Sequence, residues 1–246
     1  MATGRYFTLN TGAHIPALGL GTWRSPTKEV YAAVTTALKH IDTALIYGNE
    51  TPVGQAIRNS QIAREQIFLT TKLWNTYHTK VPKGIEDSLK HLGLDYVDLY
   101  LMHWPTWAEM QKLVDTGLVK AIGVSNFSTK NLQRLLDAES TKIVPAANQA
   151  YSPLGSNTGP LQEEPAIKDM AAKYNKTAAQ VLISWAIQRG TSVIPKSVTP
   201  SRIEQNFEDF TLEDGDIEAL NRLCQKNTVR IVDPQWGVNV FNSDDN

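Results

Sequence analysis

The sequence predicts an α/β fold in which parallel strands close into a barrel. Short apolar strands alternate with amphipathic helical segments along most of the chain, a pattern typical of a parallel sheet with helical connections. The strands are apolar up to their last residues, where polar side chains appear. Such strands are typically buried on both faces, with a site at their C-terminal ends. We expect a single domain over residues 1–246.

The first half of the chain is predicted to begin with a β-hairpin and to continue with strand–helix pairs. Residues 6–18 form the hairpin, with its turn at Asn10-Thr11-Gly12. Strands are predicted at residues 19–23, 40–44, 67–72 and 97–103. Helical spacing of apolar residues predicts helices at 26–39, at 50–59, around Ile85, Leu89 and Leu92 up to Gly93, and at 107–116 up to Gly117.

The second half continues the alternation less regularly. Strands are predicted at residues 121–124, 145–149 and 192–195. Ser128 is predicted to cap a helix with Leu132, Leu135 and Leu136, and Thr177 an apolar helix that extends to Arg189. A further helix is predicted at 200–210.

Composition excludes several classes of protein. With 24 basic and 25 acidic residues, the chain gives no reason to expect nucleic acid or an anionic membrane as a partner. The lone Cys224 excludes an intramolecular disulfide and fits a reducing compartment. No apolar run approaches the roughly 20 residues of a membrane-spanning helix, and the N-terminus lacks the apolar core of a secretory signal. We therefore expect a cytoplasmic protein and a monomer.

Asp42 and Tyr47 follow a short strand and place a carboxylate near a phenol. A phenol has an ordinary pKa of roughly 10, and a nearby lysine cation would make it a plausible proton donor by favouring phenolate. Polar residues also end the other predicted strands: Lys72, His103, Ser125, Asn126, Gln149, Lys196 and Ser197. Each alone is more often a structural hydrogen-bonding residue, but in a barrel they would converge on one face.

Several kinds of chemistry lack their motif. The five histidines show no metal-ligand spacing, and no cysteine pair accompanies them, so we expect no metal. There is no G-x-S-x-G elbow, and Gly19-Leu20-Gly21 lacks the third glycine of a Rossmann fingerprint. Residues 194–202 instead offer Lys196, Arg202 and several hydroxyls at a phosphate-binding corner, although a solvated helix start explains them equally well.

The chain resembles the aldo-keto reductases, and among them aldose-reductase-like fungal glycerol dehydrogenases and aldehyde reductases. The motifs are Gly-Thr-Trp at 21–23, Asp42 with Tyr47, Thr-Lys-Leu-Trp at 71–74, His-Trp-Pro at 103–105, Gly-Val-Ser-Asn-Phe at 123–127, Tyr-Ser-Pro-Leu-Gly at 151–155 and Ile-Pro-Lys-Ser at 194–197. The resemblance implies a (β/α)8 TIM barrel with an N-terminal β-hairpin, which binds NADPH or NADP+ without a Rossmann fold.

The resemblance also implies roles for individual residues. Asp42, Tyr47, Lys72 and His103 would form the catalytic tetrad, in which Tyr47 protonates the carbonyl oxygen and Lys72 lowers the phenol pKa. The cofactor would be held by Thr22, Trp23, Ser125, Asn126, Gln149, Tyr151, Ser152, Leu154, Ser156, Lys196, Ser197, Arg202, Gln205 and Asn206. The substrate would contact Trp23, Trp74, Trp104 and Trp236.

Three junctions depart from this pattern. Gln149 ends one predicted strand, and Tyr151 resembles the residue that follows the end of the next strand, with one residue between them. Neighbouring parallel strands need a connection of at least about 10–12 residues. Against the family, about four residues are missing at 39/40, about thirty at 105/106 and about two dozen at 149/150. We expect the sequence to lack part of the sixth and seventh strand–helix units and a substrate loop. Either the protein has residues at these junctions that the sequence omits, or the protein itself is shorter than its family. The intact mass of the purified protein would decide between them.

The leading functional hypothesis is an NADPH-dependent reductase of small aldehydes and ketones, such as glyceraldehyde and aldoses, that also oxidises glycerol-like polyols. A non-catalytic barrel of the same superfamily is the second hypothesis, which the intact tetrad disfavours. A sugar-phosphate enzyme of another barrel family is the third, and it leaves Ser125-Asn126 and three pocket tryptophans unexplained.

Overall fold

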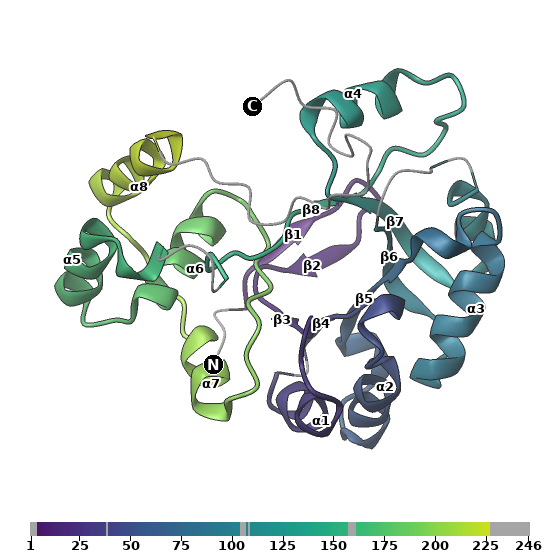
Figure 1. The fold of residues 1–246 in the computed structure, drawn as a ribbon, viewed down its shortest axis with the longest axis horizontal. Coiled ribbons are helices and arrows are strands. Elements are labelled where there is room, and N and C mark those ends of the chain that lie inside the picture. Colours follow the sequence, from purple (N-terminus) through teal and green to yellow (C-terminus); the bar gives the residue numbers. More distant parts are fainter. Residues whose placement is uncertain (1–3, 38, 104–106, 108, 157–160, 227–246) are drawn as a thin grey trace.

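The computed structural model describes residues 4–37, 39–103, 107, 109–156 and 161–226. Strands β1 (Tyr6–Thr8) and β2 (His14–Pro16) form the antiparallel hairpin. A six-stranded parallel sheet follows in chain order, and Figure 1 shows it curling beside the hairpin. Its strands are β3 (Leu20–Gly21), β4 (His40–Asp42), β5 (Phe68–Leu73), β6 (Val97–Met102), β7 (Val119–Ser125) and β8 (Asn148–Gln149).

The strand pairing of the barrel is interrupted between β8 and residues 193–196. Strand β8 pairs with β7, through Val124 to Asn148 and Ser125 to Gln149. On the other side, residues 193–196 approach β3 through two isolated parallel bridges, Leu18 to Val193 and Gly21 to Lys196. In the part of the chain that the structure describes, no strand joins β8 to residues 193–196. We call this interruption the open seam.

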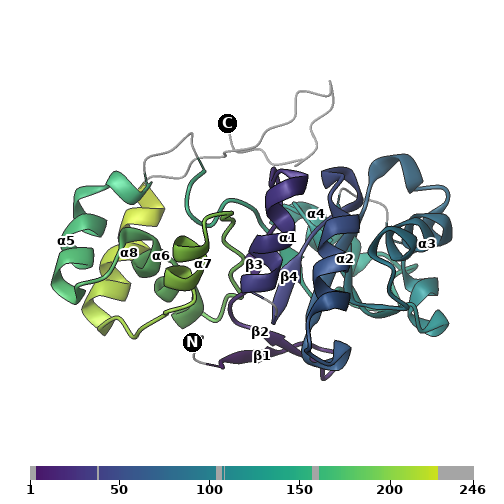
Figure 2. The same ribbon diagram turned by 90° about the horizontal axis from the view of Figure 1, so that it is seen from below.

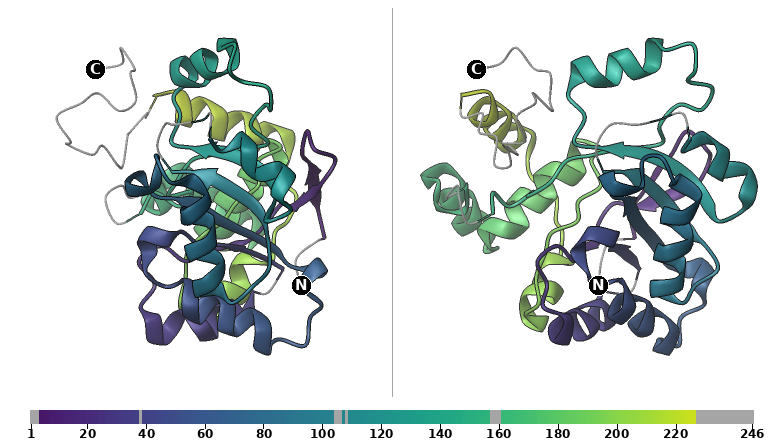
Figure 3. Two further views of the ribbon diagram at one scale, coloured as in Figure 1. Left: turned by 90° about the vertical axis from the view of Figure 1, so that its right-hand side faces the viewer. Right: turned by 45° about the vertical axis from the view of Figure 1, so that its right-hand side comes forward.

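The helices form two groups, which Figure 2 separates clearly. Next to β3–β6 lie α1 (Thr27–Thr36), α2 (Glu50–Asn59) and α3 (Val81–Leu92). The second group contains α5 (Pro165–Tyr174), α6 (Ala178–Gln188) and α8 (Asp214–Lys226), and α7 (Pro200–Asn206) connects the groups by packing against α1. Helix α4 (Thr129–Asp137) projects from the sheet after β7, as Figure 3 shows. Short 3-10 helices lie at Leu45–Tyr47, Arg64–Gln66, Asn75–Tyr77, Gln111–Thr116 and Leu161–Glu163.

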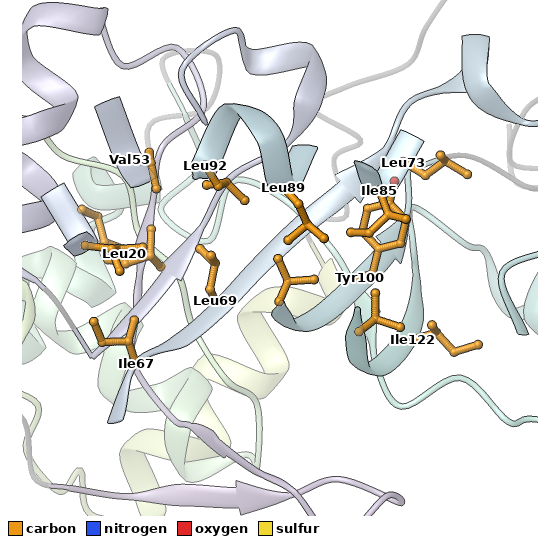
Figure 4. Packing of buried hydrophobic residues seen from close by; sticks show 14 of the residues in the cluster. Leu20, Val53, Ile67, Leu69, Leu73, Ile85, Leu89, Leu92, Tyr100 and Ile122 are labelled. Atoms are coloured by element: carbon orange, nitrogen blue, oxygen red, sulfur yellow. The ribbon is translucent and has the colours of Figure 1, made fainter. Parts of the chain in front are cut away.

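The main core lies between β3–β7 and helices α1–α3. Leu69, Ile85 and Leu92 are fully buried in it, and Figure 4 shows them packed from the sheet and α3. Gly54 permits the close approach of α2 to α3, because a Cβ there would overlap the Leu92 carbonyl oxygen. A separate cluster joins α5, α6 and α8 through residues that include Ile167 and Val181.

The predicted barrel class and hairpin are confirmed, and α2 has its predicted ends. Other predictions were wrong in their bounds or type. Helix α7 ends at Asn206 and does not reach residue 210, and β8 covers only Asn148–Gln149 of the strand expected at 145–149. The helix expected at 107–116 is a 3-10 helix confined to Gln111–Thr116. The strand expected at 192–195 is reduced to two isolated bridges, Leu18 to Val193 and Gly21 to Lys196, which do not form a continuous ladder. No helix among the described residues is long and apolar enough to cross a membrane.

Candidate active site

Four polar side chains meet at the C-terminal ends of neighbouring strands. Asp42 ends β4, Lys72 lies near the end of β5, and His103 follows β6. Tyr47 ends the 3-10 turn Leu45–Tyr47, which Gly48 closes at a φ of 66°. The fold therefore brings the four residues of the predicted tetrad to one side of the sheet.

Lys72 is the centre of this cluster. Its ammonium donates to both carboxylate oxygens of Asp42, at 2.7 and 2.8 Å, and to the Thr43 carbonyl oxygen at 2.9 Å. The Lys72 Nζ and Tyr47 Oη atoms are 3.3 Å apart. Lys72 and Asp42 are buried, so their charges are compensated by each other rather than by water.

Burial and charge act in opposite directions on these groups. Burial would lower the pKa of Lys72, but Asp42 and then Tyr47 oppose it, and the pKa lies above its ordinary value. Burial raises the pKa of the Asp42 carboxyl, against the lowering effect of Lys72. Burial also raises the pKa of Tyr47 more than Lys72 lowers it. The predicted effect of Lys72 on the phenol is present, but the net direction is the reverse of the predicted one.

His103 is held beside the phenol. Its ring contacts that of Tyr47 edge-on, with centroids 6.0 Å apart, and that of Trp74 at 5.2 Å. Burial, followed by the charge of Lys72, lowers the pKa of His103 to about 3. The imidazole is therefore neutral near neutral pH, when one ring nitrogen donates a hydrogen bond and the other accepts one.

The four residues open into a pocket of about 900 Å³. Its lining also includes most of the residues predicted to bind cofactor or substrate: Trp23, Trp74, Ser125, Asn126, Gln149, Tyr151, Ser152, Leu154, Ser156, Lys196, Ser197, Arg202, Gln205 and Asn206. Thr22 does not line it. This residue is fully buried, and its hydroxyl donates to the Asp42 carbonyl oxygen at 2.9 Å. Trp104 and Trp236 lie outside the described residues.

One wall of the pocket, at the ends of β7 and β8, is suited to an amide. Asn126 has a φ of 61°, and its Nδ2 donates to the Ser125 hydroxyl and the His103 carbonyl oxygen. Its Oδ1 is buried without a hydrogen-bond partner among the described residues. A buried acceptor of this kind is costly unless a ligand or water satisfies it.

The opposite wall, from residues 196–206, is suited to an anion. Lys196 and Arg202 are exposed side chains that line the pocket, and neither forms an ion pair with another described residue. Ser197 is buried beside them. Two cations that line one pocket without an ion-pair partner among the described residues suit a phosphate.

Sequence reasoning missed part of the lining, including Arg24, Ile46, Gln162 and Thr177. Arg24 has a φ of 56°, and its guanidinium stacks 4.5 Å from the centre of the Trp23 ring. The position of Arg24 directly after the Gly-Thr-Trp motif was a signal that could have placed it in the pocket. The sequence around Thr177 indicates only a helix cap. The described part of the chain contains no group of three or more side chains that could ligate a metal ion.

A parallel α/β barrel with a phenol–ammonium pair in a pocket at its strand ends defines the class of protein, a barrel enzyme. The chain belongs to the Aldo/keto reductase family, which it matches over residues 17–164 and 156–225. Two relatives from Saccharomyces cerevisiae are similar to it. Glycerol 2-dehydrogenase (NADP(+)) is 44% identical, with 94% of this chain and 95% of the relative aligned. Aldehyde reductase YPR1 is 43% identical over 93% and 94%.

Solved structures agree with this assignment. An aldo-keto reductase from a deep-sea metagenome library superposes with a TM-score of 0.85 and 38% identity, covering 91% of this chain and 97% of that one. An aldo/keto reductase from Brucella melitensis gives 0.84 and 41%, covering 91% and 99%. The alignment with glycerol 2-dehydrogenase extends over 296 positions, whereas this chain has 246 residues. The chain therefore lacks internal segments that this relative has.

Proposed function

We propose that this protein is an NADP(H)-dependent oxidoreductase that reduces small aldehydes and ketones, such as glyceraldehyde and aldoses, and reversibly oxidises glycerol-like polyols. The observation that carries the proposal is the hydrogen-bonded chain from Asp42 through Lys72 to Tyr47 at the base of the pocket. The named activities of the two yeast relatives support the same reaction class.

The residues divide the reaction between them. Tyr47 transfers its phenolic proton to the carbonyl oxygen, and Lys72 stabilises the phenolate left behind. Asp42 holds Lys72 in its charged form. Neutral His103 orients the carbonyl by donating a hydrogen bond. NADPH, when bound, supplies the hydride.

The two walls of the pocket fit the two ends of that cofactor. Ser125, Asn126 and Gln149 would hold the nicotinamide carboxamide, and Tyr151 would stack on its ring. Ser152, Leu154 and Ser156 would contact the pyrophosphate. Lys196, Ser197 and Arg202 would bind the 2′-phosphate, with Gln205 and Asn206 at the adenine. The substrate would lie against Trp23 and Trp74, and all these residues line one pocket.

The test is to follow NADPH absorbance with glyceraldehyde, aldoses and other small aldehydes, and NADP+ reduction with glycerol. Tyr47→Phe removes the hydroxyl and keeps the ring, so it should abolish turnover and leave NADPH affinity, measured by fluorescence, nearly unchanged. Retained turnover in that variant would refute the role of Tyr47. NADPH binding by the unaltered protein with no turnover would instead favour a non-catalytic barrel.

We further propose that the protein acts as a single-domain cytoplasmic monomer. The exposed free thiol of Cys224 fits a reducing compartment. Sedimentation would show one species of monomer mass if the proposal is right.

A further inference from the structure

Glu50 is a buried carboxylate outside the tetrad. It begins α2, three residues after Tyr47, and it is 2% exposed. Among the described residues no lysine or arginine pairs with it. Because a buried charge must be stabilised by its surroundings, its contacts indicate its role.

Glu50 joins the segment that carries Tyr47 to the strand that carries Lys72. The Thr71 hydroxyl donates to Glu50 Oε1 at 2.6 Å, and His91 Nδ1 of α3 lies 3.3 Å from Oε2. The start of α2 also favours a negative charge. Thr71 and Lys72 are neighbours on β5, so their side chains leave opposite faces of the strand. Glu50 therefore fixes β5 from the face opposite the pocket.

Asn49 makes the matching connection to β3 and β4. It is 1% exposed. Its Nδ2 donates to the Thr22 carbonyl oxygen at 2.9 Å, and its Oδ1 accepts from the Thr43 hydroxyl at 3.0 Å. The Thr43 carbonyl oxygen in turn accepts from Lys72 Nζ. Consecutive residues thus bind both neighbours of the Asp42–Lys72 pair.

We propose that Asn49 and Glu50 are positioning residues that hold Tyr47 Oη within hydrogen-bond range of Lys72. Tyr47 lies on a single 3-10 turn, and its phenol is already 3.3 Å from Nζ. A small displacement of that turn would break the contact. Glu50 acts through Thr71 and the start of α2 and does not touch the reacting atoms. The kinetic part of this inference rests on the proposed function.

The kinetic test compares Glu50→Ala with Glu50→Gln. Glu50→Ala should lower kcat about 10- to 100-fold, the scale expected for a misplaced catalytic group, with little change in NADPH affinity. The primary isotope effect with deuterated NADPH should rise, because the chemical step becomes slower. Glu50→Gln keeps an oxygen for the Thr71 hydroxyl and should recover most of kcat. A purely structural role would reduce the active fraction without changing the isotope effect.

Asp98→Asn is the matched control. Asp98 is buried, binds Arg64 and Lys120, and accepts from the Leu69 amide, but it does not line the pocket. This variant should lose stability and keep the isotope effect. Hydrogen exchange at the Tyr47 and Gly48 amides should accelerate several-fold in Glu50→Ala and not in Asp98→Asn.

The exchange measurement needs no turnover, so it tests the positioning role even if the proposed function fails. Without any turnover in the unaltered protein, the proposed function is wrong, and exchange at Tyr47 and Gly48 alone decides the role of Glu50. Exchange in Glu50→Ala that matches Asp98→Asn would overturn the inference, as would an unchanged kcat in an active enzyme.

Discussion

At the scale of single residues, burial fixes the protonation states that the chemistry needs. Burial keeps His103 neutral and raises the pKa of the Tyr47 phenol. At Lys72, Asp42 and Tyr47 raise the pKa more than burial lowers it. Near neutral pH the cluster therefore contains a protonated phenol beside an ammonium and a neutral imidazole. In the proposed reaction, reduction of a carbonyl would begin with Tyr47 already protonated, whereas alcohol oxidation would require the phenolate and be favoured at higher pH.

His40 provides a prediction about acid stability. It is buried at the start of β4, and burial, opposed by a hydrogen bond to the Pro16 backbone, lowers its pKa to about 4 from 6.5. Its folded pKa lies below its unfolded pKa, so the unfolded chain binds more protons between these values. The free energy of unfolding should therefore fall as pH drops from 6.5 to about 4.

Urea unfolding at pH 7 and pH 5 measures this effect. His40→Gln should reduce the dependence by about 1.4 kcal/mol per pH unit in that interval. His14→Gln, which removes an exposed histidine of β2, is the matched control. An identical pH dependence in His40→Gln would show that this histidine is not the titrating group.

At the scale of elements, the pocket wall from residues 196–206, which we call the phosphate wall after its proposed ligand, depends on the packing of α6 against α7. Gln180 is buried in the first turn of α6, where it completes a capping box with Thr177. Its Nε2 donates to the carbonyl oxygens of Gln205 and Glu208, at 3.0 and 3.3 Å. Helix α7 carries Arg202, Gln205 and Asn206 into the pocket. One side chain therefore stabilises the start of α6 and fixes the end of α7.

Gln180→Ala should release α7 and weaken NADPH binding several-fold while changing NADH affinity less, because NADH lacks the 2′-phosphate. Fluorescence titration with both nucleotides measures this. Gln188→Ala is the control, since Gln188 lies on the same helix and uses both ends of its amide to bind the Leu212 backbone. It should lose comparable stability and keep the nucleotide preference. Equal losses of preference in both variants would contradict the role given to Gln180.

The individual helices could be predicted from the sequence better than the closure of the strands into a barrel. Apolar periodicity and caps located α2 and the starts of α4 and α6, because those signals lie within each segment. Thr22 shows the limit at the site, since its motif implied a ligand contact while its depth in the core gives it the Asp42 carbonyl oxygen as partner. Residues 192–195 have strand composition, but strand formation also depends on partner segments far away in the sequence, and residues 193–196 form only isolated bridges to Leu18 and Gly21.

At the scale of the whole molecule, the pocket lies across the open seam. The amide wall, with Asn126 and Gln149, belongs to β7 and β8 and the loop between β7 and α4. The phosphate wall, with Lys196 and Arg202, belongs to the opposite side. In a closed barrel, strand hydrogen bonds would join these sides. Here an extended ligand that contacted both walls would supply a connection that the sheet lacks.

NADP+ should therefore restrain the two walls of the pocket relative to each other, in addition to the stabilisation that any ligand of the folded state provides. At 100 times its Kd, any ligand of the folded state adds about 2.7 kcal/mol to the free energy of unfolding. The expected distinction is local: NADP+ should slow hydrogen exchange at the Asn126 amide, which donates to Gln149, and at the Val193 amide, which donates to Ala17.

Nicotinamide mononucleotide and adenosine 2′,5′-bisphosphate, both saturating, occupy the same walls without a covalent link. Their mixture should protect the two amides less than NADP+ does, because only the intact dinucleotide restrains one wall against the other. Equal protection by the mixture would mean that each wall is ordered independently and that the cofactor does not connect the two sides of the open seam.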